Sequence, residues 1–460
     1  MGTSINKIAS IAALTSLIWP TGVSSQGAAG GLQVDIGVNS SLKVDDNFKL
    51  NPNSTGTTFF SDTQLTFGIS SVTPNSSATL SGSTILRVGD IPGRSLAGFE
   101  DQNLRFCYIL SSSNSKLTLD ARYRNVDREF IDPFQVEREE QIFGSLVGGG
   151  GVQKNRFASL NFQTGLNDPI GYSVTLSTND KSFSGVVNPA IFDTRTDIAK
   201  GSVSFAVSPV SRVSLNGGLT WFKADDAVQT DRVTRDLSVG LTQDVSPSLR
   251  FDATLGTTTV ETDRIGGTTK TSGTTGSFQV TRDVPDGSYN LSLSRSVNQN
   301  GGRTTLQVGR SLDLPRGSLS ANVGLTRGDT GSDRTTANIV YQQQLKASKY
   351  SVSLNRSIST NSASQDVLDT RLALNYGYDI DNQSRIDVTL DYGITEDAGN
   401  GTLPTVQRTN LRASYTRALT SDWNLQGGVL IRNINDDAAV GPAHSNSVFV
   451  TVDRNFSFRP

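Results

Sequence analysis

The sequence predicts an all-β fold, a transmembrane antiparallel up-and-down β-barrel of about 22 strands. Three observations support this prediction. Apolar and polar residues alternate with the period of two that a strand requires, from near the N-terminus to the C-terminus. Tight turns alternate with longer polar connections. The composition is polar, with 35% hydrophobic residues and 44 glycines among 460 residues, which suits a barrel in which every second side chain faces water.

Composition and charge exclude several other classes of protein. The formal net charge is −2, and this near-neutral balance argues against nucleic acid as a partner, since phosphate binding needs a basic patch. Helical membrane spans are excluded because no run of about 18 apolar residues occurs beyond the N-terminus. The single cysteine, Cys107, forms no intramolecular disulfide and no cysteine-based metal site. We expect no cofactor.

The N-terminal residues have the pattern of a cleaved signal peptide. Lys7 provides the positive start, residues 8–19 form the apolar core, and Val23-Ser24-Ser25 offers small residues for cleavage. The alternative is a buried N-terminal helix. We expect residues 1–25 to be removed and residues 26–460 to form a barrel in the outer membrane of a Gram-negative bacterium.

The first strand is expected to begin at Gly31, where apolar residues start to alternate with polar ones. Only a few residues separate it from the predicted cleavage site. Plugged barrels of large transporters carry their plug as a long N-terminal domain. The stretch between the predicted cleavage site and the first strand is too short for such a domain. The sequence therefore predicts a barrel with no N-terminal plug domain.

The connections fall into two kinds that alternate along the chain. Pro285-Asp286-Gly287 is one of about ten tight turns. Ala224–Thr230, Thr262–Thr271 and Glu396–Val406 are among about eleven longer connections. This sorting is typical of barrels with turns at one rim and loops at the other, and a sandwich has no reason to produce it. It predicts an even number of strands, each of about 10 residues, with both chain ends at one rim.

The segment Asp369–Ile394 illustrates the strand pattern. Residues 372–378 alternate large apolar with small or polar side chains, Asp379–Gln383 has the composition of a turn, and residues 385–394 alternate again. Successive strand residues point to opposite faces, so this hairpin has one apolar and one charged face. Alternation by itself fits a soluble sandwich as well as a barrel, and the sorted connections favour the barrel.

The last strand is apolar on one face and runs to the C-terminus. Its apolar face carries Val448, Val450, Val452, Phe456 and Phe458. Outer-membrane barrels resemble this, since they end in an apolar strand whose terminal aromatic residue the assembly machinery recognises. In this chain Arg459 and Pro460 follow the last aromatic residue.

Charged residues recur at positions expected to face the lumen. They are Arg105, Asp120, Arg122, Arg124, Arg250, Asp252, Arg371, Arg385, Asp387, Asp391 and Arg412. One interpretation is structural, with opposite charges paired across strands to keep a wide barrel rigid. The other is functional, because a hydrated wall of mixed sign suits neutral or weakly charged solutes such as sugars.

Other arginines fall on the expected lipid face. They are Arg282, Arg295, Arg310, Arg327, Arg356, Arg417 and Arg454. A charge at the middle of the bilayer costs about 2–4 kcal/mol, and almost nothing near the interface. We expect these side chains to reach the interface from the strand ends, where lipid phosphates are an alternative partner.

The long connection Asn125–Val152 has unusual apolar content for a loop. Asp132-Pro133 is a good helix start and Gly148 a good stop. The segment is expected either to fold into the lumen and narrow it or to form an external lid. The candidate constriction residues are Asp132, Phe134, Glu137, Glu139, Glu140 and Phe143.

The sequence provides little for catalysis. His444 is the only histidine, and it is expected in the last long loop. A Ser–His–Asp site would have to be built around it, and no group of histidines is available for a metal. We expect no enzyme activity.

Short motifs resemble a known family. Val44-Asp45-Asp46-Asn47-Phe48 with Asn51-Pro52, and an Arg-Ser pair after alternating strands (Arg295-Ser296, Arg310-Ser311, Arg356-Ser357), are similar to the β-barrel porins encoded beside exopolysaccharide loci in proteobacteria. The resemblance implies an outer-membrane barrel that exports polysaccharide or other surface material.

The sequence thus predicts an outer-membrane channel or conduit for polysaccharide or sugars. A non-conducting structural or adhesive surface barrel is the first alternative, and a surface hydrolase is the least favoured. The expected partners are outer-membrane lipids and lipopolysaccharide, the barrel-assembly machinery, and polysaccharide, but no nucleic acid.

Overall fold

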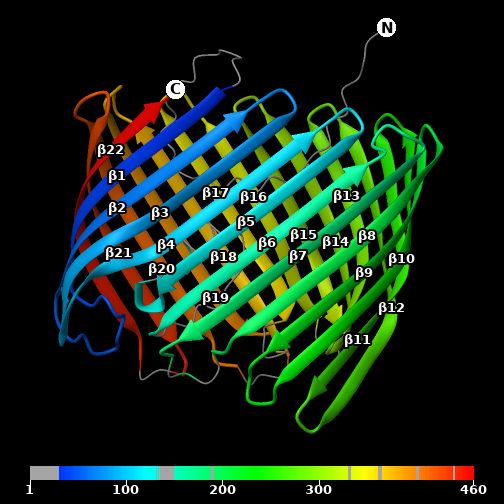
Figure 1. The fold of residues 1–460 in the computed structure, drawn as a ribbon, viewed down its shortest axis with the longest axis horizontal. Coiled ribbons are helices and arrows are strands. Elements are labelled where there is room, and N and C mark those ends of the chain that lie inside the picture. Colours follow the sequence, from blue (N-terminus) through cyan, green and yellow to red (C-terminus); the bar gives the residue numbers. More distant parts are fainter. Residues whose placement is uncertain are drawn as a thin grey trace.

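The computed structural model describes residues 31–130, 132, 134, 150–186, 188, 191–329, 333–360, 365–399, 403–438 and 441–459. Within these residues the chain forms a single 22-stranded antiparallel sheet. Each strand pairs with the next one along the chain, and β1 (Gly31–Asp45) also pairs with β22 (Ala443–Phe458). This last pairing closes the sheet into a barrel (Figure 1), as the sequence predicts. The signal peptide expected over residues 1–25 lies outside the described residues.

The remaining elements are β2 (Thr58–Val72), β3 (Ser76–Ile91), β4 (Arg94–Ser111), β5 (Ser115–Asp127), η1 (Arg128–Phe130), β6 (Val152–Thr164), β7 (Ile170–Ser184), β8 (Thr194–Ser208), β9 (Ser211–Ala224), β10 (Thr230–Ser246), β11 (Leu249–Arg264), β12 (Gly267–Val284), β13 (Gly287–Asn298), β14 (Gly301–Leu314), β15 (Gly317–Gly328), β16 (Asp333–Gln344), β17 (Ser348–Thr360), β18 (Asp366–Asp379), β19 (Ser384–Asp397), β20 (Val406–Ala418) and β21 (Trp423–Asp436). No helix among the described residues is long and apolar enough to cross a membrane.

The barrel has two rims that differ in their connections. The turn rim holds the tight turns that follow the even-numbered strands, together with the start of β1 and the end of β22, where Val34 pairs with Phe458. The loop rim holds the connections after the odd-numbered strands, and those after β3, β11 and β13 have only two residues, against the expectation of longer loops. Both ends of the sheet therefore lie at one rim (Figure 1), which confirms the expected sorting of the chain ends.

Two details of the sequence prediction are wrong. The strands run from 12 to 18 residues rather than about 10, because pairing continues beyond the length needed to cross hydrocarbon. The expected loop Thr262–Thr271 is a tight hairpin, in which Asp263 pairs with Thr268. Its turn is Ile265-Gly266, and Gly266 and Gly267 have φ values of 110° and 144°, which glycine adopts without strain. The loops within Ala224–Thr230 and Glu396–Val406 are confirmed.

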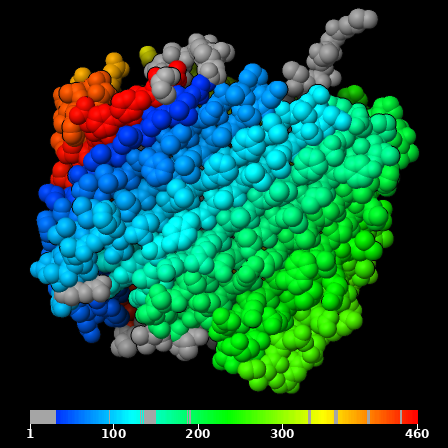
Figure 2. Space-filling model, viewed as in Figure 1, coloured from blue at the N-terminus to red at the C-terminus, as the bar shows by residue number. Residues whose placement is uncertain are grey.

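The two faces of the sheet carry different side chains. On β10, Leu237, Val239 and Leu241 are 56%, 54% and 46% exposed on the outer face, and the residues between them are small or polar. The same alternation recurs around the barrel, and the tilted strands form a continuous outer wall (Figure 2). An exposed apolar band on a closed sheet, with every backbone ladder paired, is the arrangement that lipid requires.

Aromatic residues on the outer face gather near the turn rim. They include Tyr172, Tyr289, Tyr350, Tyr378, Tyr415 and Trp423. Amphipathic rings of this kind favour the boundary between hydrocarbon and headgroups. The girdle therefore marks one membrane interface close to the turn rim.

Candidate functional site

The inward face of the barrel carries the charged residues that the sequence places there. Arg105, Asp120, Arg122, Arg124, Arg250, Asp252, Arg371, Arg385, Asp387, Asp391 and Arg412 all alternate with outward apolar neighbours along their strands. They occupy β4, β5, β11 and β18 to β20, and so do not form one compact cluster.

Most of these charges are paired with a carboxylate close by. Within single strands the N···O distances are 2.6 Å for Arg122–Asp120, 3.0 Å for Arg250–Asp252 and 2.8 Å for Arg385–Asp387. Asp120 also pairs across strands with Arg105 at 3.3 Å. The inward wall therefore carries both signs of charge but little net charge in these places.

Two lumen residues have partners that the sequence did not indicate. Asp101 has a backbone φ of 46° and lies beside a register shift between β3 and β4. Its carboxylate accepts hydrogen bonds from Nε and Nη2 of Arg124, at 2.7 and 2.8 Å. Bulges of this kind re-aim a side chain. Arg412 lies 4.3 Å from the ring centroid of Phe449 and donates to Gln426.

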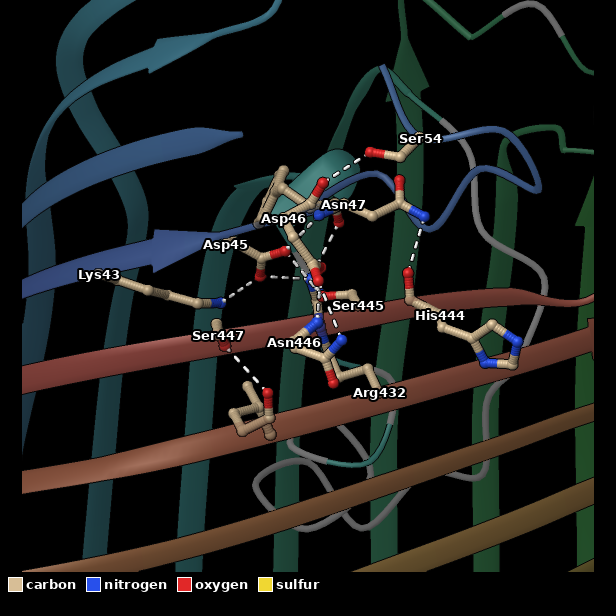
Figure 3. Close-up of polar contacts among 12 residues, drawn as sticks. Lys43, Asp45, Asp46, Asn47, Ser54, Arg432, His444, Ser445, Asn446 and Ser447 are labelled. Carbon is tan, nitrogen blue, oxygen red and sulfur yellow. Dashed lines mark hydrogen bonds and ion pairs between the residues drawn. The ribbon is translucent and has the colours of Figure 1, made fainter. Parts of the chain in front are cut away.

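A buried ionic network lies where the first and last strands meet (Figure 3). Asp45 and Ser445 are both 0% exposed. Nη2 of Arg432 on β21 donates to Asp45 Oδ2 and to Ser445 Oγ, each at 2.8 Å, and Ser445 Oγ donates to Asp45 Oδ1 at 2.7 Å. Lys43 adds a second cation at 3.2 Å. The network joins β1, β22 and β21 at the loop rim.

The loop after β1 is tied to the same place (Figure 3). Asn47 Nδ2 donates to the carbonyl oxygen of His444 at 2.8 Å, and Nη2 of Arg432 donates to the carbonyl of Phe48 at 3.1 Å. Asp46 accepts two hydrogen bonds from Asn446, at 2.7 and 2.9 Å. Phe48 is consequently held inward, where it is 8% exposed.

Phe48 belongs to an aromatic mouth cluster made of Phe48, Phe60, Ile91, Leu96 and Phe130. The three rings lie with centroids 4.7 to 5.8 Å apart, and the guanidinium of Arg87 sits 4.1 Å from the Phe130 ring. Arg87 is itself fixed by both oxygens of Asp62, each at 2.8 Å. The cluster joins the loop after β1 to η1, and Lys49–Glu129 at 2.8 Å reinforces that junction.

Beyond η1 the chain contacts the inward face of β19 to β21, on the other side of the β1–β22 junction. Asn410 on β20 donates to Asp132 Oδ2 at 3.0 Å, and Phe134 packs on Val406 and Ile434. Gly393 leaves room for that ring, since a Cβ there would lie 2.8 Å from Phe134 Cε1. The segment that leaves β5 thus contacts inward residues of β19, β20 and β21. The candidate residues Glu137, Glu139, Glu140 and Phe143 lie outside the described residues.

These contacts divide the inward wall into two parts. Toward the loop rim of β18 to β22 and β1 to β3, inward side chains such as Arg371, Asp391 and Arg408 are only 5 to 7% exposed. The inward faces of β12 to β17, called the open wall, keep Ser277, Gln279, Ser294, Ser296 and Asn338 exposed, while the inward residues of β14, β15 and β17 are mostly half-buried. Among the described residues, the segments that fold inward cover one side of the mouth only.

Sequence reasoning missed the residues that organise the mouth. Alternation along the strands would have placed four of them on the lumen side, namely Asp45, Arg87, Arg408 and Arg432. Their pairing could not be found in that way, because Asp45 and Arg432 are brought together only by the closure of β1 on β22. The aromatic residues of loops gave no periodic signal at all.

The outward arginines lie toward the two rims, and most have a carboxylate partner. At the loop side the pairs are Arg295–Asp329 at 3.0 Å, Arg327–Asp333 at 3.7 Å and Arg356–Glu396 at 3.8 Å. At the turn side Arg310 pairs with Asp286 at 2.7 Å, and Arg454 lies 5.0 Å from the Trp423 ring. In the loop after β15, the N–H of Gly302 and the guanidinium of Arg295 lower the pKa of Asp329 below its usual value.

His444 and Cys107 form no constellation with each other. His444 is the second residue of β22 rather than part of a loop, because the strand begins at Ala443, and its Nδ1 is 2.8 Å from Asn433 Oδ1. Cys107 is a free, partly buried thiol on the inward face of β4. Among the described residues, His, Cys, Asp and Glu form no group that could hold a metal ion.

Comparison with known proteins identifies the fold. No protein-family model and no curated protein matches the chain. Among solved structures, 94% of the chain aligns with 81% of a ferric enterobactin receptor mutant of Pseudomonas aeruginosa, at 9% identity and a TM-score of 0.54. An iron transporter of Neisseria meningitidis gives 8% identity, 94% and 82% coverage and a TM-score of 0.60. A siderophore receptor of P. aeruginosa aligns over 94% of this chain and 81% of its own, at 8% identity and a TM-score of 0.51.

Identities this low show a shared fold. The closed barrel, its exposed apolar outer band, its even number of strands and its girdle of aromatic residues are the features of an outer-membrane barrel. The protein is therefore a large outer-membrane β-barrel of a Gram-negative bacterium.

Proposed function

We propose that the protein is an outer-membrane channel that conducts uncharged, hydroxyl-rich solutes, with polysaccharide or sugars as its cargo. The observation that carries the proposal is the open wall, a polar inward surface on β12 to β17 that the described residues leave uncovered. A barrel of about 22 strands is too wide for side chains alone to fill. The resemblance to porins encoded beside exopolysaccharide loci supports the choice of cargo.

The lumen carries no catalytic constellation among its described residues, so transport rather than chemistry is the proposed role. The paired charges on β4, β5, β11 and β19 fit both the structural and the functional interpretation of the sequence. They stiffen the wall, and because their signs cancel locally they let neutral solutes pass without strong electrostatic trapping.

The proposal includes three partners. Outward arginines near the rims, such as Arg327, are proposed to contact phosphates of outer-membrane lipids and lipopolysaccharide. The apolar end of β22 is proposed as the part that the barrel-assembly machinery recognises. Polysaccharide is proposed as the transported partner.

The test is reconstitution of the purified mature chain. We expect stepwise ion conductance in planar bilayers, and liposomes that swell in solutions of neutral oligosaccharide. Liposomes that carry a denatured preparation serve as the control. Folded protein that neither conducts nor passes sugar would contradict the channel. The non-conducting adhesive barrel would then be favoured, since the mouth cluster already covers part of the lumen.

A further inference from the structure

We propose that the open wall holds a binding site for an uncharged glycan, centred on a row of asparagines across β13 to β17. This inference rests on the proposed function and names the substrate class of the same lumen. It is carried by three observations, which are the row itself, a hollow beside it, and a buried hydroxyl in that hollow that has no partner among the described residues.

The row follows directly from the strand register. Asn290 pairs with Gly309, Gly309 with Asn322, Asn322 with Asn338, and Asn338 with Asn355. All five residues occupy positions of their strands that face the lumen. Four carboxamides therefore lie in one line across five strands. Neighbouring strands are about 4.8 Å apart, and the line therefore runs across the lumen wall rather than along one strand.

Gly309 makes part of the row continuous. Asn290 Nδ2 donates to Asn322 Oδ1 at 3.0 Å, although β14 lies between their strands. A Cβ at Gly309 would overlap both carboxamide oxygens. A glycine here therefore allows two amides to meet over the intervening strand.

The hollow lies on the loop side of the row, over β14 to β17. Its volume is about 200 Å³. Polar side chains make up most of its lining, among them Thr305, Gln307, Thr326, Thr336, Asn338 and Asn355, and the lining also includes Arg303, Arg356, Ala337 and Ile358. Thr336 is 6% exposed, and its Oγ1 has no hydrogen-bond partner among the described residues. An unpaired buried hydroxyl is costly, and a ligand hydroxyl in the hollow would satisfy it.

The chemistry of the lining selects the ligand. A carboxamide donates and accepts at once, and so does a hydroxyl, so this surface matches the hydroxyl groups of a sugar ring. Charged inward residues on β13 to β17 lie near the strand ends, and Arg303 is engaged by Asp366 at 2.9 Å. The middle of the wall therefore offers no free cation for an acidic glycan and no apolar surface for a lipid.

The test uses the reconstituted full mature chain with two probes of equal length, maltoheptaose as a neutral glycan and an oligogalacturonate as an anionic one. We expect maltoheptaose to block the ion current and the anionic probe to block it less. T336V removes the unpaired hydroxyl while keeping the shape, and N355A removes a carboxamide. Each variant should weaken the maltoheptaose block by about tenfold, the effect of one lost hydrogen bond.

The matched control is T254V, because Thr254 lies on the inward face of β11 and bonds Ser277 at 2.7 Å outside the hollow. A conducting channel whose sugar block is unchanged by T336V and N355A, or weakened equally by T254V, overturns the site but keeps the channel. If no conductance is found, calorimetric titration of the detergent-solubilised protein with maltoheptaose decides. Binding that T336V weakens supports the site without the channel, and absence of binding overturns both.

Discussion

At the scale of single residues, the environment of Asp45 explains how a charge can be stable inside the mouth. Its carboxylate is fully buried, yet Arg432, Ser445 and Lys43 all direct donors at it. A buried ion pair stabilises a fold only when hydrogen bonds satisfy its charged groups. Both carboxylate oxygens of Asp45 accept hydrogen bonds, whereas Nε of Arg432 has no partner among the described residues. The network also holds the carbonyl of Phe48, so the same guanidinium fixes both the strand junction and the inward loop.

We expect R432M to destabilise the barrel by about 3–5 kcal/mol, because it leaves Asp45 buried without its principal cation. The measurement is the urea midpoint of unfolding in lipid vesicles, followed by tryptophan fluorescence. The control is R250M, since Arg250 and Asp252 are 52% and 36% exposed, and loss of an exposed pair costs at most about 1 kcal/mol. Equal losses of stability in the two variants would show that the buried network around Asp45 stabilises the barrel no more than an exposed ion pair does.

The loop carboxyl of Asp329 provides a test by pH. The N–H of Gly302 contributes more to its low pKa than Arg295 does. A lowered carboxyl pKa stabilises the folded loop above the unfolded pKa, and this stabilisation is lost as pH falls through the folded value. We expect R295Q to raise the pKa of Asp329 only in part, as measured by NMR titration of its carboxyl carbon. Full return to the ordinary value would assign the shift to Arg295 instead.

At the scale of elements, β22 both closes the barrel and carries the aromatic end of the chain. Phe456 and Phe458 pair with Ile36 and Val34 of β1, and their rings stack with centroids 6.4 Å apart. Loss of these residues would open the turn-rim end of the seam and expose unpaired backbone groups to lipid, which is strongly unfavourable.

We therefore expect deletion of residues 456–460 to abolish assembly while export continues. The folded form is detected by its faster migration in unheated gels and by its sedimentation with outer membranes. Deletion of Arg459 and Pro460 alone is the control, because it leaves every pairing with β1 in place. Normal outer-membrane levels of the longer deletion would contradict the role given to the terminal aromatic residues.

The segment that leaves β5 is a second element with a testable role. Asp132 and Phe134 attach it to β20 and β21, so these two residues lie against the loop-side part of the inward wall. We expect the double variant D132A/F134A to raise single-channel conductance, because the attachment is lost. F162A is the control, since Phe162 is 39% exposed on the outer face. Unchanged conductance would favour an external lid, the alternative interpretation of this loop.

At the scale of the whole molecule, the sequence predicted the fold more completely than the site. Alternation in segments such as Asp369–Ile394 determines which face of a strand is apolar. The alternation of short and long connections determines the topology. Both patterns are local properties of the sequence, and so both could be predicted. The Asp45–Arg432 pair depends on residues 387 positions apart, and the asparagine row depends on the register of five strands. Period-two alternation contains no information about register between strands, so neither could be read from it.

The distribution of inward charge leads to the last prediction. Arg122, Arg250 and Arg385 each face a carboxylate within 3.0 Å, and the charge of the whole chain is only −2. A wide lumen with locally cancelled charges, and an open wall whose middle part is uncharged, has no strong potential to favour one ion. We therefore expect a reversal potential near zero in a gradient of KCl across a planar bilayer. R250E should move it toward cation selectivity, because it leaves two carboxylates on the inward face of β11 without their cation. A strongly anion-selective or cation-selective native channel would show that unpaired charges, and not the neutral wall, control the passage.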